Sequence, residues 1–262
     1  ISAKYNGESC SEYIGPNGAG HYVKMVHNGI EYSDMQLIAE SYFILKYGLR
    51  LNNTELSVIF KEWNQGELES YLIEITSHIL SKKNEDGNFI LDFILDEASN
   101  KGTGTWTAKS ALDLHVPLSL ITESVFARYL SSIKSQRVIA STLFKGPKLF
   151  KISATEIDGF VEDLRKSLFL GKILSYSQGF SQMKSASEKY RWNLKFYNIA
   201  KIFRSGCIIK AKLLQHIMLA FENNNDLINL LFSPYFSAIV NDYQTSLRRI
   251  LIFAIKNGIS LP

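Results

Sequence analysis

Five polar residues near the N-terminus recur at helical spacing and carry groups that could transfer protons. Positions i, i+3, i+4, i+7 and i+8 of a helix share one face. An amine, an imidazole, an amide, a carboxyl group and a phenol would therefore lie on a single stripe. An amine and a carboxyl group on one rigid face can act as base and acid on the same substrate. The five residues are Lys24, His27, Asn28, Glu31 and Tyr32.

The flanking glycines suggest close approach of another group. Glycines in residues 15–20 would expose the N-terminus of the helix, where free N–H groups and the helix dipole favour anions. Their Gly-x-x-Gly-x-Gly pattern follows no convincing strand, so it is not a dinucleotide fingerprint. Gly29 costs about 1 kcal/mol inside a helix, which a closely packed ligand or helix would explain. The pattern alone leaves a second interpretation open, a solvated face with a Lys24–Glu31 pair.

Helical periodicity dominates the rest of the chain and predicts an all-α fold. We expect two long helices, over residues 20–46 and 155–184. No set of alternating strands with turn signals occurs. Pro117 suits the first turn of a helix that continues to about Ile133. Shorter helices are expected at 54–63, 67–80, 194–203, 208–222 and 235–256.

Three further segments are less regular. Residues 100–107 contain two glycines and are predicted to form a loop. Residues 88–96 hold an apolar run too short to distinguish strand from helix. Gly258 could end the last helix in a left-handed conformation.

A faint internal repeat relates the two halves of the chain. Residues 61–66 align with residues 201–206 at an offset of 140 positions. The repeat predicts two similar helical bundles, over about 18–145 and 155–256, each opened by a long helix within one domain of residues 1–262. Chance similarity between amphipathic helices is the alternative.

Composition excludes several classes of protein. With 262 residues, 46% of them hydrophobic, the chain can bury a large core. Its net charge of +4 is scattered rather than clustered, which argues against nucleic-acid binding. No apolar stretch reaches the roughly 18 residues that a membrane span needs. Cys10 and Cys207 lack metal-ligand spacing and fit a reducing, cytoplasmic setting.

The run of residues 18–32 resembles the signature of the 6-phosphogluconate dehydrogenases almost residue for residue, and residues 34–38 continue it. Further similar motifs follow in the family's order along essentially the whole chain. They occupy residues 101–104, 106–107, 110–112, 123–128, 178–180, 192–194 and 206–209. The resemblance implies the helical domain of the family, which binds substrate and forms a homodimer.

The resemblance also implies a reaction. The family oxidises 6-phosphogluconate with NADP, releases carbon dioxide and yields ribulose 5-phosphate, without a metal. Lys24 corresponds to the general base at the C3 hydroxyl, and Glu31 to the general acid that protonates C1 of the enediol. The family's substrate-binding positions, the last three of them at the phosphate, correspond to His27, Asn28, Tyr32, Lys101 and Arg128.

The chain departs from the family's pattern in several places. The NADP-binding Rossmann domain precedes this segment in the family, and a C-terminal tail follows it into the neighbouring subunit's site. No residue here matches either part, so we expect the 262 residues alone to be inactive. Thr105 replaces a usual lysine, and Arg191 and Ser205 replace usual glycines.

Two other functions remain open at this point. One is a non-catalytic helical dimerisation module from a truncated or degenerate gene. The other is a related β-hydroxyacid dehydrogenase, although those enzymes lack the run of residues 27–32 that this chain contains.

Overall fold

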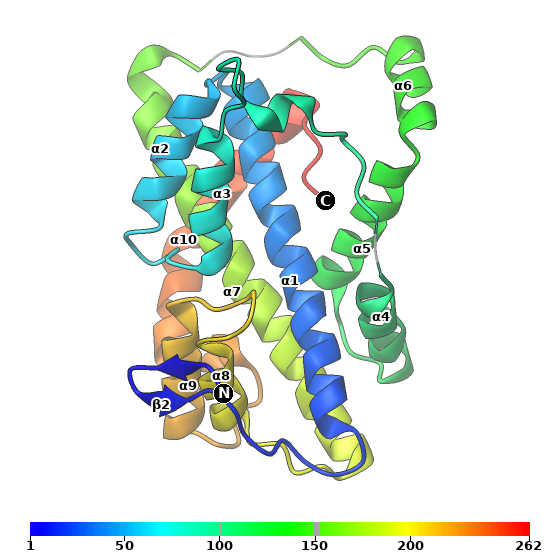
Figure 1. Ribbon diagram of the computed structural model, residues 1–262, viewed down its shortest axis with the longest axis vertical. Coiled ribbons are helices and arrows are strands. Elements are labelled where there is room, and N and C mark those ends of the chain that lie inside the picture. The colour runs from blue at the N-terminus through cyan, green and yellow to red at the C-terminus, as the bar shows by residue number, and fades with distance from the viewer. Residues whose placement is uncertain (100, 149–151) are drawn as a thin grey trace.

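Two long helices form the axis of the molecule (Figure 1). The computed structural model describes residues 1–99, 101–148 and 152–262. Helices α1 (Ala19–Phe43) and α7 (Ile157–Tyr190) pack along each other, and α10 (Pro234–Lys256) packs on α7. On the other side of α1 lie α4 (Thr103–Asp113) and α5 (Ser119–Ser132). The predicted all-α class is confirmed.

The remaining elements are short and surround this axis. Helices α2 and α3 pack as a pair, as do α8 and α9, whereas α6 extends from α5 (Figure 1). A small antiparallel hairpin holds the two strands seen in the described residues. The bounds are β1 (Lys4–Tyr5), β2 (Glu8–Ser9), α2 (Asn53–Trp63), α3 (Tyr71–Ser81), α6 (Lys134–Leu143), α8 (Phe196–Phe203) and α9 (Leu213–Asn223), with a π-helical turn at Ile44–Gly48 and 3₁₀ turns at Ile90–Phe93, Ala154–Glu156 and Leu230–Phe232. None of the described helices is long and apolar enough to cross a bilayer.

Several helix ends have a local cause in the sequence. Asn52 caps α2 in a capping box with Glu55, and the Ser70 hydroxyl accepts a hydrogen bond from the backbone N–H of Ile73 in α3. Beyond α10, Gly258 has φ 64°, in agreement with the predicted left-handed end. Arg191 ends α7 with φ 56°, a conformation that glycine adopts with less strain.

Some predicted boundaries were wrong. The loop predicted at residues 100–107 already contains the start of α4 at Thr103, because Gly102 makes the left-handed turn that opens the helix with φ 100°. Residue 100 of that loop lies outside the described residues. Helix α6 was not expected beyond residue 133, and α3 and α9 begin four and five residues later than predicted, at Tyr71 and Leu213.

Glycines allow α1 and α7 to approach closely. A Cβ atom on Gly179 would lie 2.5 Å from Ile30, and one on Gly171 would lie 2.8 Å from Leu37. Ile30 lies opposite Gly179, and Leu37 lies opposite Gly171. The residue numbers rise along one helix as they fall along the other, so the two helices run antiparallel. The apolar side of α1 that packs here includes the fully buried Ile30.

A buried ion pair crosses this interface. The Lys172 ammonium lies 2.6 Å from both carboxylate oxygens of Asp34, and each side chain is only 1% exposed. The hydroxyl groups of Ser33 and Ser175 form a second polar link between the helices. Removing two charges from water is unfavourable, so this pair depends on its two partners remaining together.

We expect Lys172→Met to lower the free energy of unfolding by about 3–5 kcal/mol, because the Asp34 carboxylate would remain buried without a counter-charge. Urea unfolding monitored by circular dichroism measures the change. The double variant Asp34→Leu, Lys172→Met is the control and should recover much of the loss, since it buries no charge. A single variant as stable as the wild type would contradict this expectation.

Candidate functional site

The predicted polar stripe lies on one unbroken helix, α1. The Lys24 ammonium lies 3.2 Å from His27 Nδ1, which lies 3.0 Å from Asn28 Oδ1. Lys24 is exposed, whereas Asn28 and Glu31 are partly buried. The stripe therefore joins an accessible amine to groups that are partly or fully shielded from water.

His27 is buried beneath the amine. Its side chain is 1% exposed, and its ring meets the Phe203 ring edge-on, 5.2 Å between centroids. Burial, with a smaller contribution from the Lys24 charge, lowers the pKa of His27 from 6.5 to about 4. The imidazole is thus neutral near pH 7. In the tautomer protonated on Nε2, Nδ1 accepts a hydrogen bond from Lys24, whereas in the tautomer protonated on Nδ1 it donates one to Asn28 Oδ1.

Glu31 has an environment that favours its protonated form. Burial raises the pKa of its carboxyl group, and the nearby Asp34 charge acts in the same direction. The charges of Lys24 and Arg128 oppose that rise. A carboxyl group with a raised pKa retains a proton closer to neutral pH, as a general acid must.

Arg128 reaches this stripe from α5. Its guanidinium carbon lies 4.0 Å from the centroid of the Tyr32 ring, in a cation–π contact. Nη1 donates a hydrogen bond of 2.9 Å to the carbonyl oxygen of Ser99, and Nη2 donates one of 3.5 Å to Met35 Sδ. Lys101 is exposed, two residues before α4, and forms no ion pair within the described residues.

Two glycines bring α4 against the stripe. A Cβ atom on Gly29 would lie 2.7 Å from Thr107, and one on Gly104 would lie 2.6 Å from the Tyr32 ring. The Thr107 hydroxyl also donates a hydrogen bond of 2.9 Å to the carbonyl oxygen of Met25. A closely packed second helix is therefore the reason for Gly29 in α1, one of the two explanations the sequence suggested.

Met35 was not singled out from the sequence as a site residue. It lies four residues after Glu31 and three after Tyr32, so it extends the same helical stripe by one turn. That periodicity was the signal that could have found it. Thr105, where the family usually has lysine, lies 2.6 Å from the Tyr129 hydroxyl on α5. No cluster of three potential metal ligands occurs among the described residues.

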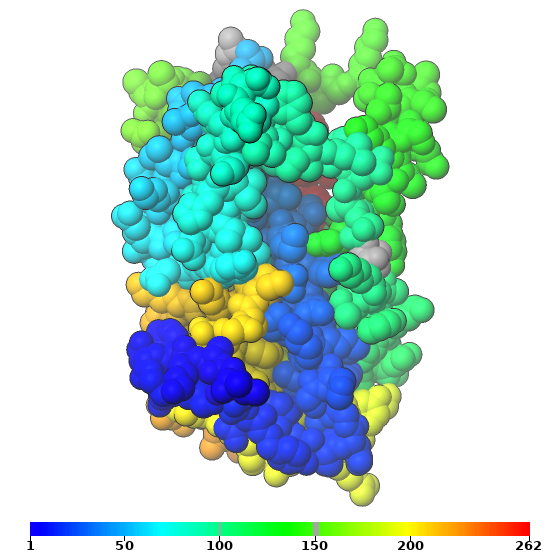
Figure 2. Space-filling view, in the orientation of Figure 1, coloured from blue at the N-terminus to red at the C-terminus, as the bar shows by residue number. Residues whose placement is uncertain are grey.

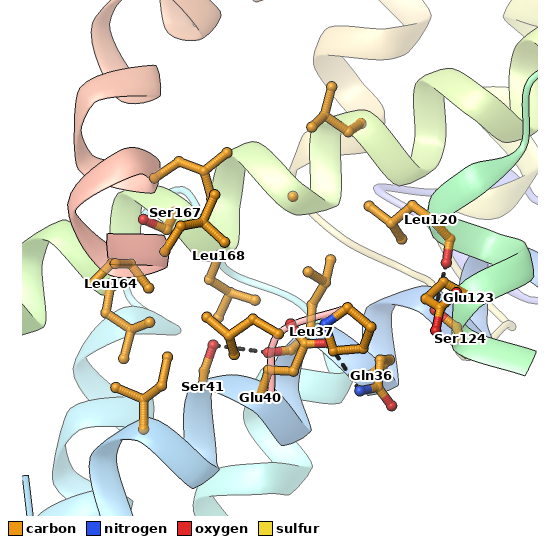
Figure 3. Close-up of a pocket in the computed structure, with 18 residues that line it drawn as sticks. Gln36, Leu37, Glu40, Ser41, Leu120, Glu123, Ser124, Leu164, Ser167 and Leu168 are labelled. Atoms are coloured by element: carbon orange, nitrogen blue, oxygen red, sulfur yellow. Dashed lines mark hydrogen bonds between the residues drawn. The ribbon is translucent and has the colours of Figure 1, made fainter. Parts of the chain in front are cut away.

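A separate pocket of about 160 Å³ lies between α1, α5, α7 and α10 (Figure 3). Leucine side chains form much of its wall, and the Glu40 carboxylate accepts a hydrogen bond of 2.9 Å from Gln36 there. Burial raises the pKa of Glu40 to about 7. The residues of the polar stripe do not line this pocket, and its apolar wall is unsuited to a phosphorylated sugar acid.

We expect Gly104→Ala to destabilise the chain by about 1–3 kcal/mol, because the new methyl group overlaps the Tyr32 ring. Gly159→Ala is the matched control. Gly159 lies in α7 with open space around its Cα, so alanine there should stabilise by up to about 1 kcal/mol. Thermal unfolding of both variants measures the difference, and an equal effect at both positions would be inconsistent with close packing of α4.

The low pKa of His27 predicts a site-specific titration. Its ring should remain neutral until the pH approaches about 4, and Lys24→Met should raise this pKa by removing a repelling charge. Nitrogen-15 NMR of the imidazole follows the titration. As the pH falls from 6.5 towards 4, the unfolded chain binds a proton that the folded chain does not, so stability contributed by His27 is lost. A midpoint near 6.5 in the wild type would show that His27 is not buried as described.

Comparison with known proteins shows close relatives along the whole chain. The family model described as 6-phosphogluconate dehydrogenase, C-terminal domain, matches residues 20–262. A protein of Buchnera aphidicola subsp. Acyrthosiphon pisum (strain APS), named 6-phosphogluconate dehydrogenase, decarboxylating, is 63% identical over 262 residues, 100% of this chain and 56% of the relative. A Shigella sonnei protein of the same name is 60% identical over 257 residues, 98% of this chain and 57% of the relative.

A solved structure agrees with these relatives. It is described as Plasmodium falciparum 6-phosphogluconate dehydrogenase in its apo form, in complex with its cofactor NADP+ and in complex with its substrate 6-phosphogluconate. It superimposes with a TM-score of 0.94 at 42% identity, over 99% of this chain and 56% of that chain. The chain thus spans a little over half the length of the relatives it matches. It belongs to the 6-phosphogluconate dehydrogenase family and corresponds to the C-terminal domain.

Proposed function

We propose that the chain binds 6-phosphogluconate as the substrate domain of an NADP-dependent, decarboxylating dehydrogenase. The observation that supports this most directly is the geometry of α1. An exposed amine, Lys24, and a partly buried carboxyl group with a raised pKa, Glu31, project from one face of an unbroken helix. A non-catalytic dimerisation module is not favoured, because both groups are present and the relatives are named as dehydrogenases.

Lys24 is the proposed base. In its neutral form it takes the proton of the C3 hydroxyl group as hydride leaves C3. The exposure of Lys24 supports this role, since the amine is accessible to a substrate. The resulting ammonium donates a hydrogen bond to the C3 carbonyl oxygen, which stabilises the negative charge that develops there as C1 leaves as carbon dioxide.

Glu31 is the proposed acid. Loss of carbon dioxide leaves an enediol, and the protonated carboxyl group delivers a proton to its terminal carbon to give ribulose 5-phosphate. The burial that raises the pKa of Glu31 supports this role. Because Lys24 and Glu31 differ by seven positions, they meet adjacent parts of one extended substrate.

The proposed substrate contacts divide by charge. Asn28 is assigned to the hydroxyl and carboxylate groups of the sugar acid together with His27, whose buried ring would act on them through its neighbours Lys24 and Asn28. Tyr32, Lys101 and Arg128 hold the phosphate, where Arg128 can bind two oxygens at once. The stacking of Arg128 on Tyr32 supports this assignment.

NADP would supply the acceptor for the hydride. The described residues include no strand, glycine loop and helix arranged as a dinucleotide site. We therefore propose that the main NADP site lies on residues outside this chain, as its 56% coverage of a relative permits. The two free cysteines agree with reaction in the reducing cytoplasm.

We expect Lys24→Met to reduce turnover by about 10²–10⁴-fold in a protein that joins this chain to its dinucleotide-binding domain, because general base catalysis is lost. Thermal stability should hardly change, since Lys24 is exposed. NADP reduction coupled to carbon dioxide release measures the effect. Lys109→Met, an exposed lysine on α4, is the control and should retain full activity.

The same assay tests Lys24 in two ways. Turnover near that of the wild type in Lys24→Met would reject this residue as the base. The 262 residues alone should show no turnover because they lack the dinucleotide site. Clear NADP reduction by them would contradict the proposal that the main NADP site lies on residues outside this chain.

We also propose that a second copy of the chain covers α6. This helix has no buried residue, although Val138, Ile139 and Leu143 are apolar and each more than half exposed. Phe126 and Leu130 of α5 are also more than half exposed. In the space-filling view α6 stands apart from the helices on the other side of the molecule (Figure 2). Several exposed apolar side chains on successive helices are typical of a subunit interface.

Light scattering at several concentrations tests the homodimer. The wild type should have the mass of two chains, whereas Val138→Lys, Ile139→Lys should be a folded monomer, because α6 contributes no buried residue to its own chain. Val58→Lys is the control: Val58 is 50% exposed on α2, on the far side of the molecule from α6 (Figure 1). A monomeric wild type, or a dimeric double variant, would reject α6 as the interface.

A further inference from the structure

The Arg128 guanidinium is held from three directions by other groups of the chain. The Tyr32 ring lies beneath its plane, the Ser99 carbonyl oxygen accepts from Nη1, and Met35 Sδ accepts from Nη2. A ring contact alone fixes the distance of the guanidinium from the ring, but it permits the guanidinium to rotate in its own plane. The two hydrogen bonds, on different nitrogens, restrict that rotation.

These contacts leave donors available. A guanidinium has five N–H groups, and one of Nη1 and one of Nη2 are used. The other three have no partner among the described residues. A planar fork with free donors in a set orientation is the arrangement that binds a phosphate through two oxygens.

Of the three groups that hold Arg128, only Met35 contributes its contact through a mobile side chain. Ser99 contributes a backbone oxygen, and the Tyr32 ring is wedged against Gly104, so neither depends on a mobile side chain. Met35 is 40% exposed, so burial of an apolar side chain accounts for only part of its placement. Thioether sulfur is a weak acceptor, but here its donor carries a positive charge, which strengthens the bond.

We infer that Met35 is a positioning residue, which orients Arg128 and thereby helps the site to distinguish a phosphorylated sugar acid from an unphosphorylated one. This inference rests on the proposed function, in which Arg128 binds the substrate phosphate. Met35 itself touches neither the phosphate nor the reacting carbons. It acts by keeping Arg128 ordered, so that less side-chain freedom is lost when the phosphate binds.

Two substitutions separate hydrogen bonding from packing. Leucine has nearly the volume of methionine but cannot accept a hydrogen bond. Glutamine has a similar length and restores an acceptor in its amide oxygen. Met35→Leu should therefore weaken binding of 6-phosphogluconate by about threefold to tenfold, the range expected when one side chain must be ordered anew. Met35→Gln should bind close to the wild-type level.

Titration of the chain with 6-phosphogluconate and with gluconate, followed by carbon-13 methyl NMR, measures both affinities. The loss in Met35→Leu should be confined to the phosphorylated ligand, because only that ligand needs Arg128. Unfolding curves of the three proteins verify that each is folded. The NMR signal of the Met35 methyl group tests the contact with Arg128 directly. Its chemical shift should change in the Arg128→Met variant even without ligand.

The possible results of these titrations distinguish a failure of the role of Met35 from a failure of the proposed function. Binding of 6-phosphogluconate by the wild type with no loss in Met35→Leu, or equal losses for both ligands, overturns the role of Met35 and leaves the proposed function in place. Failure of Met35→Gln to recover affinity also overturns it. No binding of 6-phosphogluconate by the wild type overturns the proposed function, and the role of Met35 with it.

Discussion

The close antiparallel contact of α1 with α7 is the constraint on which the rest of the structure depends. Gly171 and Gly179 remove the side chains that would hold the helices apart, and the Lys172–Asp34 pair then lies fully enclosed between them. A wider spacing would admit water to the charges, and a shifted register would separate them. Shape and charge therefore specify the same alignment of the two helices.

This alignment also determines which face of α1 remains for function. The side that carries Ile30 is buried against α7, so the stripe of Lys24 and Glu31 is directed elsewhere. Asp34 belongs to both regions, since it pairs with Lys172 and adds a small contribution to the burial that raises the pKa of Glu31. One carboxylate on α1 thus lies between the core ion pair and the proposed acid.

The second half of the proposed site comes from elements distant in sequence. Helix α4 approaches through Gly104 and Gly29, and α5 places Arg128 over Tyr32. Each contact is local and small, but together they set a cation next to a stripe that already carries an amine and a carboxyl group. Such fixed geometry is what proton transfer and phosphate binding require, because neither tolerates loose placement.

The sequence by itself determined the all-α class, the two long helices and the spacing of the polar stripe on α1, because helical periodicity is a local property that three to four residues reveal. The family resemblance supplied the proposed roles of Lys24, Glu31 and Arg128, whereas the internal repeat remains a prediction. Only the tertiary structure decided that His27 is buried and neutral, that Met35 contacts Arg128, and that α6 stands exposed. Burial and contacts between distant elements depend on which helices meet, and no spacing within a single helix specifies that.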